Sequence, residues 1–260
     1  METPQTESIS LEAYEKMEPV CTLTIDDKKI HYAIPTTQTK WRVDTLFTKE
    51  PDTIQWIESF NSKDVFLDIG ANVGMYTIFA SAYRGVTTYA FEPESLNFSL
   101  LNRNLYLNQL HDKVTAYCIA ISDVTKFDKL YLSSFSVGGS CHSFAEEVDF
   151  HLNKMDSSFA QGSFSTTIDE MVTSGVMEQP NHIKVDVDGF EHKVFDGAIE
   201  TLTNPICKSI LLELNTNLEL HKTLIDSVEA LGYKLDREGL KQSIRADGAF
   251  KGVGNHVFRR

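Results

Sequence analysis

The sequence predicts an α/β protein built on a parallel β-sheet with helices on both faces. Short apolar runs of the kind that parallel sheets bury recur along the chain from residue 64 onward. Segments with apolar residues at helical spacing separate these runs, and strand–helix–strand alternation is typical of parallel sheets. A glycine or a carboxylate closes several of the runs. Such sheets bind ligands at the carboxyl ends of their strands, so functional residues are expected there.

The elements before the sheet are of a different kind. Residues 21–34 alternate between apolar and polar side chains around an Asp-Asp-Lys turn, which predicts a β-hairpin. Residues 35–50 are interpreted as an irregular linker. Pro51 then opens an amphipathic helix. These patterns divide the chain into an N-terminal extension of hairpin plus helix, residues 1–60, and a second domain over residues 61–260.

The second domain carries the alternating elements. Strands are predicted at 65–70, 87–93, 114–122, 182–189, 209–215, 233–240 and 255–260. Helices are predicted at 73–83, 95–110, 166–175, 190–202 and 217–231. Residues 133–165 interrupt this rhythm with nine serines and no sustained period. This insertion is either an ordered functional loop or a disordered excursion.

Composition excludes several classes of function. The chain has 24 Lys and Arg against 37 Asp and Glu, a formal net charge of −13, which disfavours nucleic acids and anionic membranes as partners. No apolar run approaches the ~20 residues that cross a bilayer, and the first residues do not resemble a signal peptide. The four cysteines form no C-x-x-C pair. We therefore expect a cytoplasmic protein with idle thiols and no membrane span.

The turn after the first sheet strand, Asp68-Ile-Gly70-Ala-Asn72-Val-Gly74, favours a particular ligand. In a dinucleotide fingerprint a second glycine would stand at Asn72 and a third would follow, but neither is present. Asp68 would also repel a pyrophosphate. The turn suits a ligand with a cationic end, and S-adenosylmethionine has an ammonium and a sulfonium group.

Two carboxylates follow at later strand ends. Glu92 stands 24 residues after Asp68, where a carboxylate accepts hydrogen bonds from both ribose hydroxyls of an adenosine. Asp123 closes the third strand, where an adenine amino group would lie. The alternatives stay open: Glu92 as a solvated strand-end carboxylate, and Asp123 as an ordinary turn aspartate.

The motifs together resemble the FkbM-type S-adenosylmethionine-dependent methyltransferases. They are VFLDIGANVGMYT (65–77), AFEPESLNFSLLNRNLYLN (90–108), CIAISD (118–123), TTIDEM (166–171) and IKVDVDGFEHKVFDGA (183–198). The last one departs from the family pattern I-K-x-D-x-E-G-x-E-x-x-V-L-x-G-A at Asp188 and Phe195, where the family usually has Glu and Leu. The resemblance covers residues 64 to about 215.

This resemblance implies a three-layer, Rossmann-like class I methyltransferase sheet of seven strands, the last one antiparallel. It also implies a cofactor, S-adenosyl-L-methionine. The residues that it assigns to the methionine end are Asp68, Gly70, Asn72 and Gly74, with Glu92 on the ribose and Asp123 on the adenine. The family mostly methylates hydroxyl groups, often on sugars of polysaccharides, glycolipids or natural products.

A sugar hydroxyl is a poor nucleophile, so a base or a metal must assist methyl transfer. Lys184, Asp186 and Asp188 alternate along the fourth strand, and Glu213 lies near the end of the fifth. A lysine within an apolar strand needs a carboxylate partner, Asp186 or Glu213, so a structural ion pair is as open as a catalytic role. His192 is a further candidate base, with an ordinary surface histidine as its alternative.

The sequence also offers candidate metal ligands and candidate contacts with the methyl acceptor. Asp186, Glu213 and Asn215 offer oxygen ligands that could bind Mg²⁺, although the sequence does not require a metal. Candidate contacts with the acceptor are Ser140 and His142 in the insertion and Trp41 and Arg42 in the linker. A mobile loop, core packing of the tryptophan and a surface salt bridge of the arginine are the alternatives.

The sequence thus favours an S-adenosylmethionine-dependent O-methyltransferase that acts on a hydroxyl group of a sugar. An alternative is a protein that binds the same cofactor and methylates another small molecule, or has no activity. An NAD-dependent reductase comes third, because the dinucleotide glycines and a Y-x-x-x-K dyad are missing. The expected partner is a small-molecule or glycan acceptor, and a homo-oligomer remains open.

Overall fold

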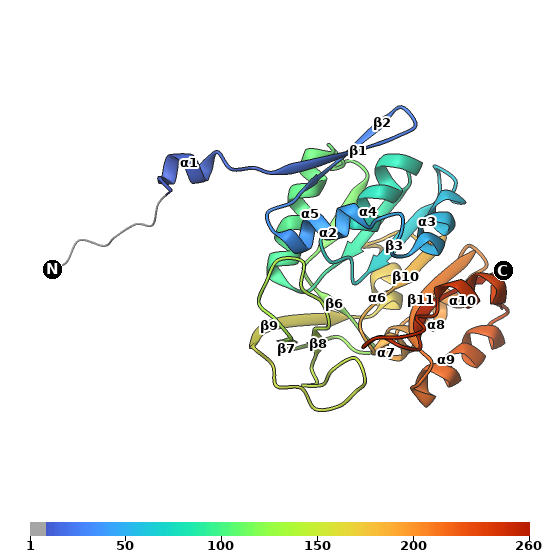
Figure 1. Ribbon diagram of the computed structural model, residues 1–260. Helices are drawn as coiled ribbons and strands as arrows, with labels where there is room; N and C mark the ends of the chain where they lie inside the picture. The colour runs from blue at the N-terminus through green and yellow to red at the C-terminus, as the bar shows by residue number, and fades with distance from the viewer. Residues whose placement is uncertain (1–8) are drawn as a thin grey trace.

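The structure is a computed structural model that describes residues 9–260. The first eight residues of the expected N-terminal extension lie outside the described residues. A seven-stranded sheet of order β12-β13-β11-β10-β3-β4-β5 forms the middle layer, with helices on both sides (Figure 1). Its strands are β3 (Val65–Ile69), β4 (Thr87–Phe91), β5 (Val114–Tyr117), β10 (His182–Val185), β11 (Ser209–Asn215), β12 (Lys234–Leu235) and β13 (Val253–Arg259).

The strand directions confirm the predicted sheet. β3 pairs in parallel with β4 on one side and with β10 on the other, and β4–β5 and β10–β11 are parallel as well. The last strand, β13, is antiparallel to β11 and β12. The strand order reverses between β3 and β10, so a topological switch point lies there, where open α/β sheets bind ligands.

Apolar residues on the two faces of the sheet build separate cores. Because strand residues alternate between faces, Phe66 joins one buried cluster and its neighbour Leu67 the other. The Phe66 cluster packs the sheet against α3 (Pro51–Glu58), α4 (Met75–Phe79) with its π-helical continuation η1 (Ala80–Arg84), and α5 (Ser95–Leu107). The Leu67 cluster packs it against α6 (Ile168–Thr173), α7 (Glu191–Asp196), α8 (Ile199–Thr203) and α9 (Glu219–Ala230).

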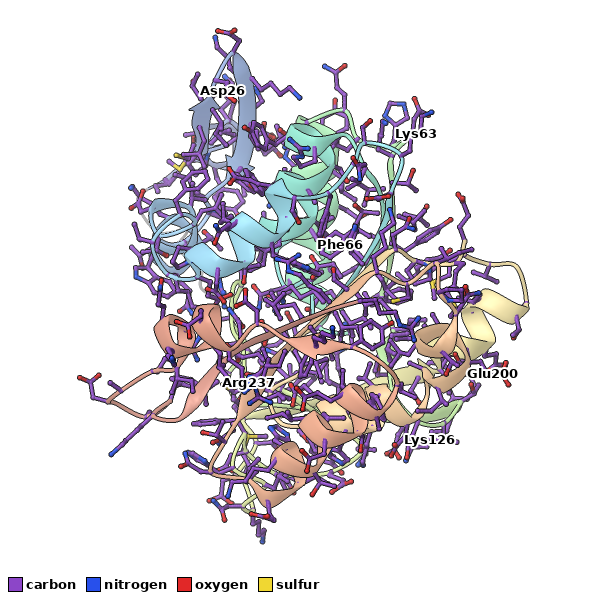
Figure 2. The ribbon with its side chains drawn as sticks, turned by 90° about the vertical axis from the view of Figure 1, so that its right-hand side faces the viewer. Asp26, Lys63, Phe66, Lys126, Glu200 and Arg237 are labelled. Carbon is purple, nitrogen blue, oxygen red and sulfur yellow. The ribbon has the colours of Figure 1, made fainter. Side chains whose placement is uncertain are left out.

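The N-terminal part begins with α1 (Leu11–Glu15), which stands away from the rest of the molecule (Figure 1). The predicted hairpin is present as β1 (Val20–Ile25) and β2 (Lys28–Ala33). Its tip is marked by Asp26 in Figure 2. Ile30 and Tyr32 are fully buried in the Phe66 cluster. The hairpin is therefore packed onto the same core as α3, α4 and α5.

The linker prediction is wrong for part of residues 35–50, because they contain helix α2 (Thr37–Asp44). A capping box made by Thr36 and Thr39 starts this helix. The usual Glu or Gln is replaced by a second threonine, and the only buried residues of the helix are Thr39 and Val43. The sequence therefore contained neither a standard capping box nor an apolar stripe.

The insertion is ordered around a second sheet of order β6-β9-β7-β8. Its strands are β6 (Ala120–Ile121), β7 (Lys126–Leu132), β8 (Ser143–Phe144) and β9 (Phe159–Thr166). The predicted third strand, 114–122, is thus two strands in two different sheets. The predicted strand 233–240 is also mostly wrong: after β12, Asp236 accepts a hydrogen bond from Gly239 N and starts α10 (Arg237–Ser243). Within residues 9–260, none of the helices combines the length and apolarity needed to span a bilayer.

Candidate active site

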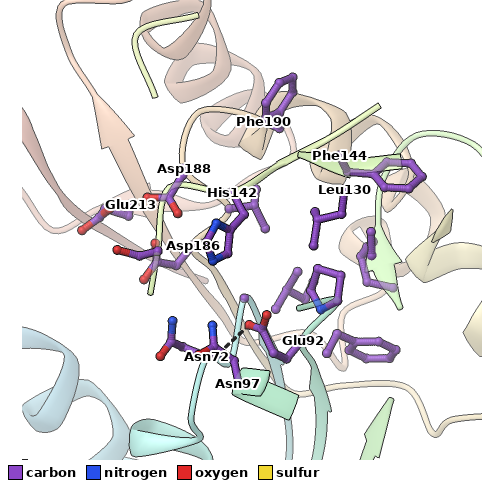
Figure 3. Close-up of a pocket in the computed structure, with 18 of the residues that line it drawn as sticks. Asn72, Glu92, Asn97, Leu130, His142, Phe144, Asp186, Asp188, Phe190 and Glu213 are labelled. Carbon is purple, nitrogen blue, oxygen red and sulfur yellow. Dashed lines mark hydrogen bonds between the residues drawn. The ribbon is translucent and has the colours of Figure 1, made fainter. Parts of the chain in front are cut away.

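A cavity of about 510 Å³ lies at the carboxyl ends of β3, β4, β10 and β11 (Figure 3). This volume falls within the range of roughly 300–1,000 Å³ that small-molecule sites occupy. Residues after these strands form its floor, while α2 and the insertion complete its wall. The cavity therefore occupies the topological switch point. Its wall includes Gly70, Asn72, Glu92, Asp186, Asp188, Glu213, Lys49, Arg245, Trp41, Arg42, Ser140 and His142.

The glycine turn after β3 is shaped by close contacts. Gly70 has φ +76°, and an added Cβ would lie 1.8 Å from the carbonyl oxygen of Asp186. Only glycine fits where the β3 turn meets the end of β10. Gly74 has φ +83°, and its Cβ would lie 2.3 Å from Leu101 Cδ1, so this glycine lets α4 approach α5. Gly70 lines the cavity and Gly74 does not.

Glu92 presents its carboxylate to the cavity from the end of β4. Its Oε2 accepts a hydrogen bond from Asn72 N at 2.8 Å (Figure 3), and its Oε1 accepts one from Glu94 N at 2.8 Å. Burial raises the pKa of Glu92 to about 7, although these two backbone donors oppose the shift. Each oxygen keeps one further acceptor position. The carboxylate is therefore fixed in place and still able to accept two hydrogen bonds from a ligand.

Asp68 and Asp123 do not line the cavity, contrary to their expected roles as direct cofactor contacts. Asp68 is fully buried: its Oδ2 accepts from Thr77 Oγ1 at 2.6 Å, and its Oδ1 lies 3.8 Å from Lys184 Nζ. Asp123 is exposed and accepts a hydrogen bond from Ser122 Oγ. It follows β6, which has left the main sheet, and Ser122 lines the cavity instead.

Lys184 has the carboxylate partner that its buried position requires. Its Nζ lies 3.1 Å from Asp186 Oδ2 and 5.3 Å from the ring centroid of Tyr76. Burial would lower the pKa of Lys184, but Asp186 and Asp68 outweigh it and raise the pKa above its usual value. Glu213, the other expected partner, pairs with Arg245 at 2.8 Å. Lys184 does not line the cavity, so it can act on a ligand only through Asp186.

Three carboxylates meet at one end of the cavity and form what we call the acidic cluster: Asp186, Asp188 and Glu213. They offer oxygens within 4.8 Å of one another. Burial would raise the pKa of Asp186, but Lys184 and then Lys49 hold it below its usual value.

The other two members are shifted in the opposite direction. Burial and the charge of Asp186 raise the pKa of Asp188 to about 6 and that of Glu213 well above its usual value. The pKa values of Asp186 and Glu213 are thus shifted in opposite directions, although Arg245 opposes the rise at Glu213. Neighbouring carboxyl groups whose pKa values are shifted apart in this way can serve as acceptor and donor of protons.

Asn215 and His192 lie apart from this cavity. The side chain of Asn215 has other partners: its Nδ2 lies 3.2 Å from Nδ1 of His151 in the insertion, and its Oδ1 accepts from Asn217 N. Asp188 thus stands where the sequence suggested Asn215 as a ligand of a metal. His192 is half-buried on α7, where burial lowers its pKa. Neither residue reaches the place that its expected role requires.

The insertion is fastened to the cavity at Gly138 and Gly139. The carbonyl of Gly138 accepts hydrogen bonds from Gln38 Nε2 and from Nε and Nη2 of Arg42. The carbonyl of Gly139 accepts from Asn72 Nδ2 at 2.7 Å and from Asn97 Nδ2 at 3.0 Å. Arg42 therefore serves to attach the insertion to α2. The disordered alternative for this segment is wrong, since it is clamped to α2, α5 and the glycine turn.

Ser140, His142 and Trp41 line the cavity, as expected of acceptor contacts. His142 Nδ1 faces the backbone N–H of Ser133 at 3.3 Å, so Nδ1 is an acceptor and the ring proton is on Nε2. This Nε2 is buried and has no hydrogen-bond partner among the described residues. It offers a ligand a hydrogen-bond donor rather than a base. Trp41 is 48% exposed.

Several cavity residues were not predicted from the sequence, among them Lys49, Asn97 and Arg245. Asp188 was noted at the end of the fourth strand but was not assigned a role. Lys49 and Arg245 belong to segments without a readable motif. Arg245 reaches the cavity only because β13 brings its loop beside β11.

The chain matches the model of the methyltransferase FkbM domain over residues 68–235, more than half of its length. It is 24% identical over 189 residues to the hexuronic acid methyltransferase AglP of Haloferax volcanii, covering 72% of this chain and 71% of that protein. It is also 24% identical over 171 residues to the 31-O-demethyl-FK506 methyltransferase FkbM of Streptomyces tacrolimicus, covering 58% and 65%.

Among solved structures, the methyltransferase FkbM of Methylobacillus flagellatus is similar with a TM-score of 0.51 at 14% identity. The match covers 77% of this chain and 44% of that one, so the chain spans less than half of the solved protein. This likeness agrees with the class I methyltransferase fold described above. The match to the domain model over more than half of the chain shows that the chain belongs to the FkbM methyltransferase family.

Proposed function

We propose that this protein transfers a methyl group from S-adenosylmethionine to a hydroxyl group of a sugar or sugar-like acceptor. The observation that supports this proposal most is that one cavity has two polar ends, each with its own set of side chains. Glu92 presents two free acceptor positions near the glycine turn, and the acidic cluster faces the cavity from the β10 and β11 side. A nucleoside and an acceptor hydroxyl require these two different environments.

The cofactor would lie along the β3 and β4 ends of the cavity. Glu92 accepts hydrogen bonds from the two ribose hydroxyls, and Gly70 leaves room for close approach of the methionine part. Phe91, Ile119 and Ile121 line the same cavity and offer an apolar surface for the adenine. S-adenosylmethionine supplies a methyl carbon bound to a sulfonium, which any nucleophile must approach in line at about 3 Å.

The acceptor would lie toward the acidic cluster. Asp186 stays ionised through Lys184 and can accept the hydroxyl proton as the oxygen attacks. The Nε2–H of His142 provides a donor that orients a further oxygen. Trp41, which lines the cavity and is 48% exposed, offers a ring on which a sugar can stack. A cavity with carboxyl groups, a donor and an aromatic ring suits a polyhydroxylated ring.

The relatives agree with this acceptor class. Their names describe a hexuronic acid and a natural product lacking one O-methyl group as methyl acceptors. Sugar hydroxyls of glycans, glycolipids or natural products are therefore the first acceptors to test. The predicted cytoplasmic location and a homo-oligomer remain open predictions.

A metal is not needed to balance the acidic cluster. Asp186 pairs with Lys184, and Glu213 pairs with Arg245. We propose that these cations, rather than Mg²⁺, hold the carboxylates in place. Turnover of the wild-type protein should then be unchanged by EDTA. Activity that EDTA removes and Mg²⁺ restores would assign the cluster to a metal.

Calorimetry followed by a methyl-transfer assay tests the function. The protein should bind S-adenosylmethionine and not NAD. With radiolabelled S-adenosylmethionine, label should enter glucuronic acid oligosaccharides or another hydroxylated acceptor. Binding without transfer to any acceptor would favour a cofactor-binding protein without activity. Binding of NAD would favour the reductase and reject the proposal.

A further inference from the structure

The loop between β10 and α7 is held by a carboxylate that does not line the cavity. Glu191 is fully buried, and its Oε1 accepts hydrogen bonds from Val187 N at 3.0 Å and Gly189 N at 3.3 Å. Its Oε2 lies 3.2 Å from the same Gly189 N. These two N–H groups flank Asp188, a member of the acidic cluster. Glu191 thus grips the chain on both sides of a cavity residue.

The gripped residues have an unfavourable backbone conformation. Asp188 has φ +53° and Gly189 has φ +114°. A residue with a side chain rarely adopts positive φ unless its surroundings impose it, and such residues cluster at functional sites. The conformation places the Asp188 carboxylate beside Asp186 and Glu213. Its Oδ2 there accepts a hydrogen bond from Cys141 N at 2.7 Å, which ties the insertion to the loop.

His221 of α9 holds the same loop from its other side. Its Nδ1 accepts a hydrogen bond from Asn215 N at 2.9 Å, so the ring proton is on Nε2 and the ring is neutral. This Nε2–H faces the carbonyl of Gly189 at 3.2 Å and Glu191 Oε2 at 3.3 Å. The peptide groups around Gly189 are therefore held through both N–H and C=O.

A simple start of a helix does not explain this arrangement. Helix α7 has no side-chain cap, and the Glu191 carboxylate bonds to N–H groups of the preceding loop instead. Its only partner among the charged or titratable side chains of the described residues is the neutral His221. Burial of a carboxylate without a cation is costly, and it raises the pKa of Glu191 to about 8. The group whose burial is costly is therefore the one that fixes the loop carrying Asp188, a member of the acidic cluster.

We propose that Glu191, supported by His221, is a positioning residue: it holds Asp188 in its left-handed conformation and through it fixes the insertion over the acceptor side of the cavity. This inference rests on the proposed function for its catalytic consequence. Its structural part, the coupling from Glu191 through Asp188 to Cys141, can be measured without any acceptor.

Hydrogen exchange tests that structural part. In Glu191→Gln an NH2 group replaces one of the two acceptor oxygens. In either orientation of the amide this NH2 group faces an N–H donor and cannot accept its hydrogen bond, so the loop must loosen. Amide exchange in 186–190 and 139–143 should accelerate at least tenfold, while the hairpin at 20–33 stays unchanged. Glu191→Asp keeps the carboxyl group but shortens the side chain, and it should show a smaller effect in the same two segments. Unchanged exchange at 139–143 in both variants would overturn the proposal.

Asp64→Asn is the matched control, because Asp64 is another buried carboxylate that contacts a histidine, His182, but at the opposite ends of the strands. It should lower the melting temperature without accelerating exchange selectively in either segment. If the control accelerates exchange in both segments as Glu191→Gln does, the effect is ordinary loss of stability and the proposal is wrong.

Kinetics with a glucuronic acid oligosaccharide as acceptor separate positioning from stability. Glu191→Gln should lower kcat about 10- to 100-fold and leave the Kd for S-adenosylmethionine within about threefold. Adding Glu191→Gln to Asp188→Asn should lower kcat no further, because the first acts through the second. Additive losses would refute the coupling. If the wild type has no turnover, the proposed function fails, while the exchange experiment still decides the role of Glu191.

Discussion

Replacing Glu92 by alanine should weaken binding of S-adenosylmethionine about 10- to 150-fold. The carboxylate accepts hydrogen bonds from Asn72 N and Glu94 N whether or not a ligand is bound, so the loss of these two largely cancels from the binding free energy. What remains is the loss of the two ribose hydrogen bonds to a charged acceptor. Their removal costs about 1.5–3 kcal/mol, which corresponds to that change in Kd.

Calorimetry on folded protein measures this effect, and Glu94→Gln provides the control. Glu94 is equally buried, but its carboxylate caps α5 by accepting from Leu96 N and Asn97 N, and it does not line the cavity. The control should lose stability by about 1 kcal/mol and keep its affinity for the cofactor. Equal affinities of wild type and Glu92→Ala would refute the ribose assignment.

Three further predictions concern the buried ionisable residues Asp186, Lys184 and Glu92. Asp186→Asn should lower turnover roughly 10²- to 10⁴-fold with little change in cofactor affinity, as steady-state kinetics and calorimetry would show; full turnover would make the ion pair structural. Lys184→Met should lower the free energy of unfolding in urea by about 3–5 kcal/mol, because Asp186 and Asp68 lose their buried partner; a loss below 1 kcal/mol would contradict this. The pKa of Glu92 is raised from 4.5 to about 7 on folding, so its burial destabilises the free protein increasingly as pH rises through that window. Urea unfolding of Glu92→Gln should show a weaker decline in stability between pH 4.5 and 7 than wild type.

Much of the fold was predictable because its signals are local. Buried parallel strands show as apolar runs, and the turn after β3 needs Gly70 for a contact that no other residue permits. The position of Glu92 at a strand end beside the cavity was predictable for the same reason, since this residue directly follows an apolar run. Helix α2 and strand β9 were missed because neither has a strong apolar stripe.

The side-chain directions at strand ends were not predictable. Asp68 and Asp186 both occupy the ends of apolar strands, yet only Asp186 faces the cavity. Which of them is covered depends on the pairing of β3 with β10 and on Thr77 and Lys184 beneath the turn. The expected position of Asp123 beside the cofactor was wrong for a similar reason, because the chain leaves the main sheet at β6. These outcomes depend on contacts between distant segments, which periodicity does not encode.

A crystal structure of the wild-type protein with S-adenosylhomocysteine and glucuronic acid would test the central claim most directly. Both ribose hydroxyls should lie within hydrogen-bond distance of the Glu92 carboxylate, and an acceptor hydroxyl should lie within hydrogen-bond distance of Asp186 or Asp188. A nucleoside bound away from Glu92, or an acceptor whose hydroxyl groups all point away from the acidic cluster, would contradict the account.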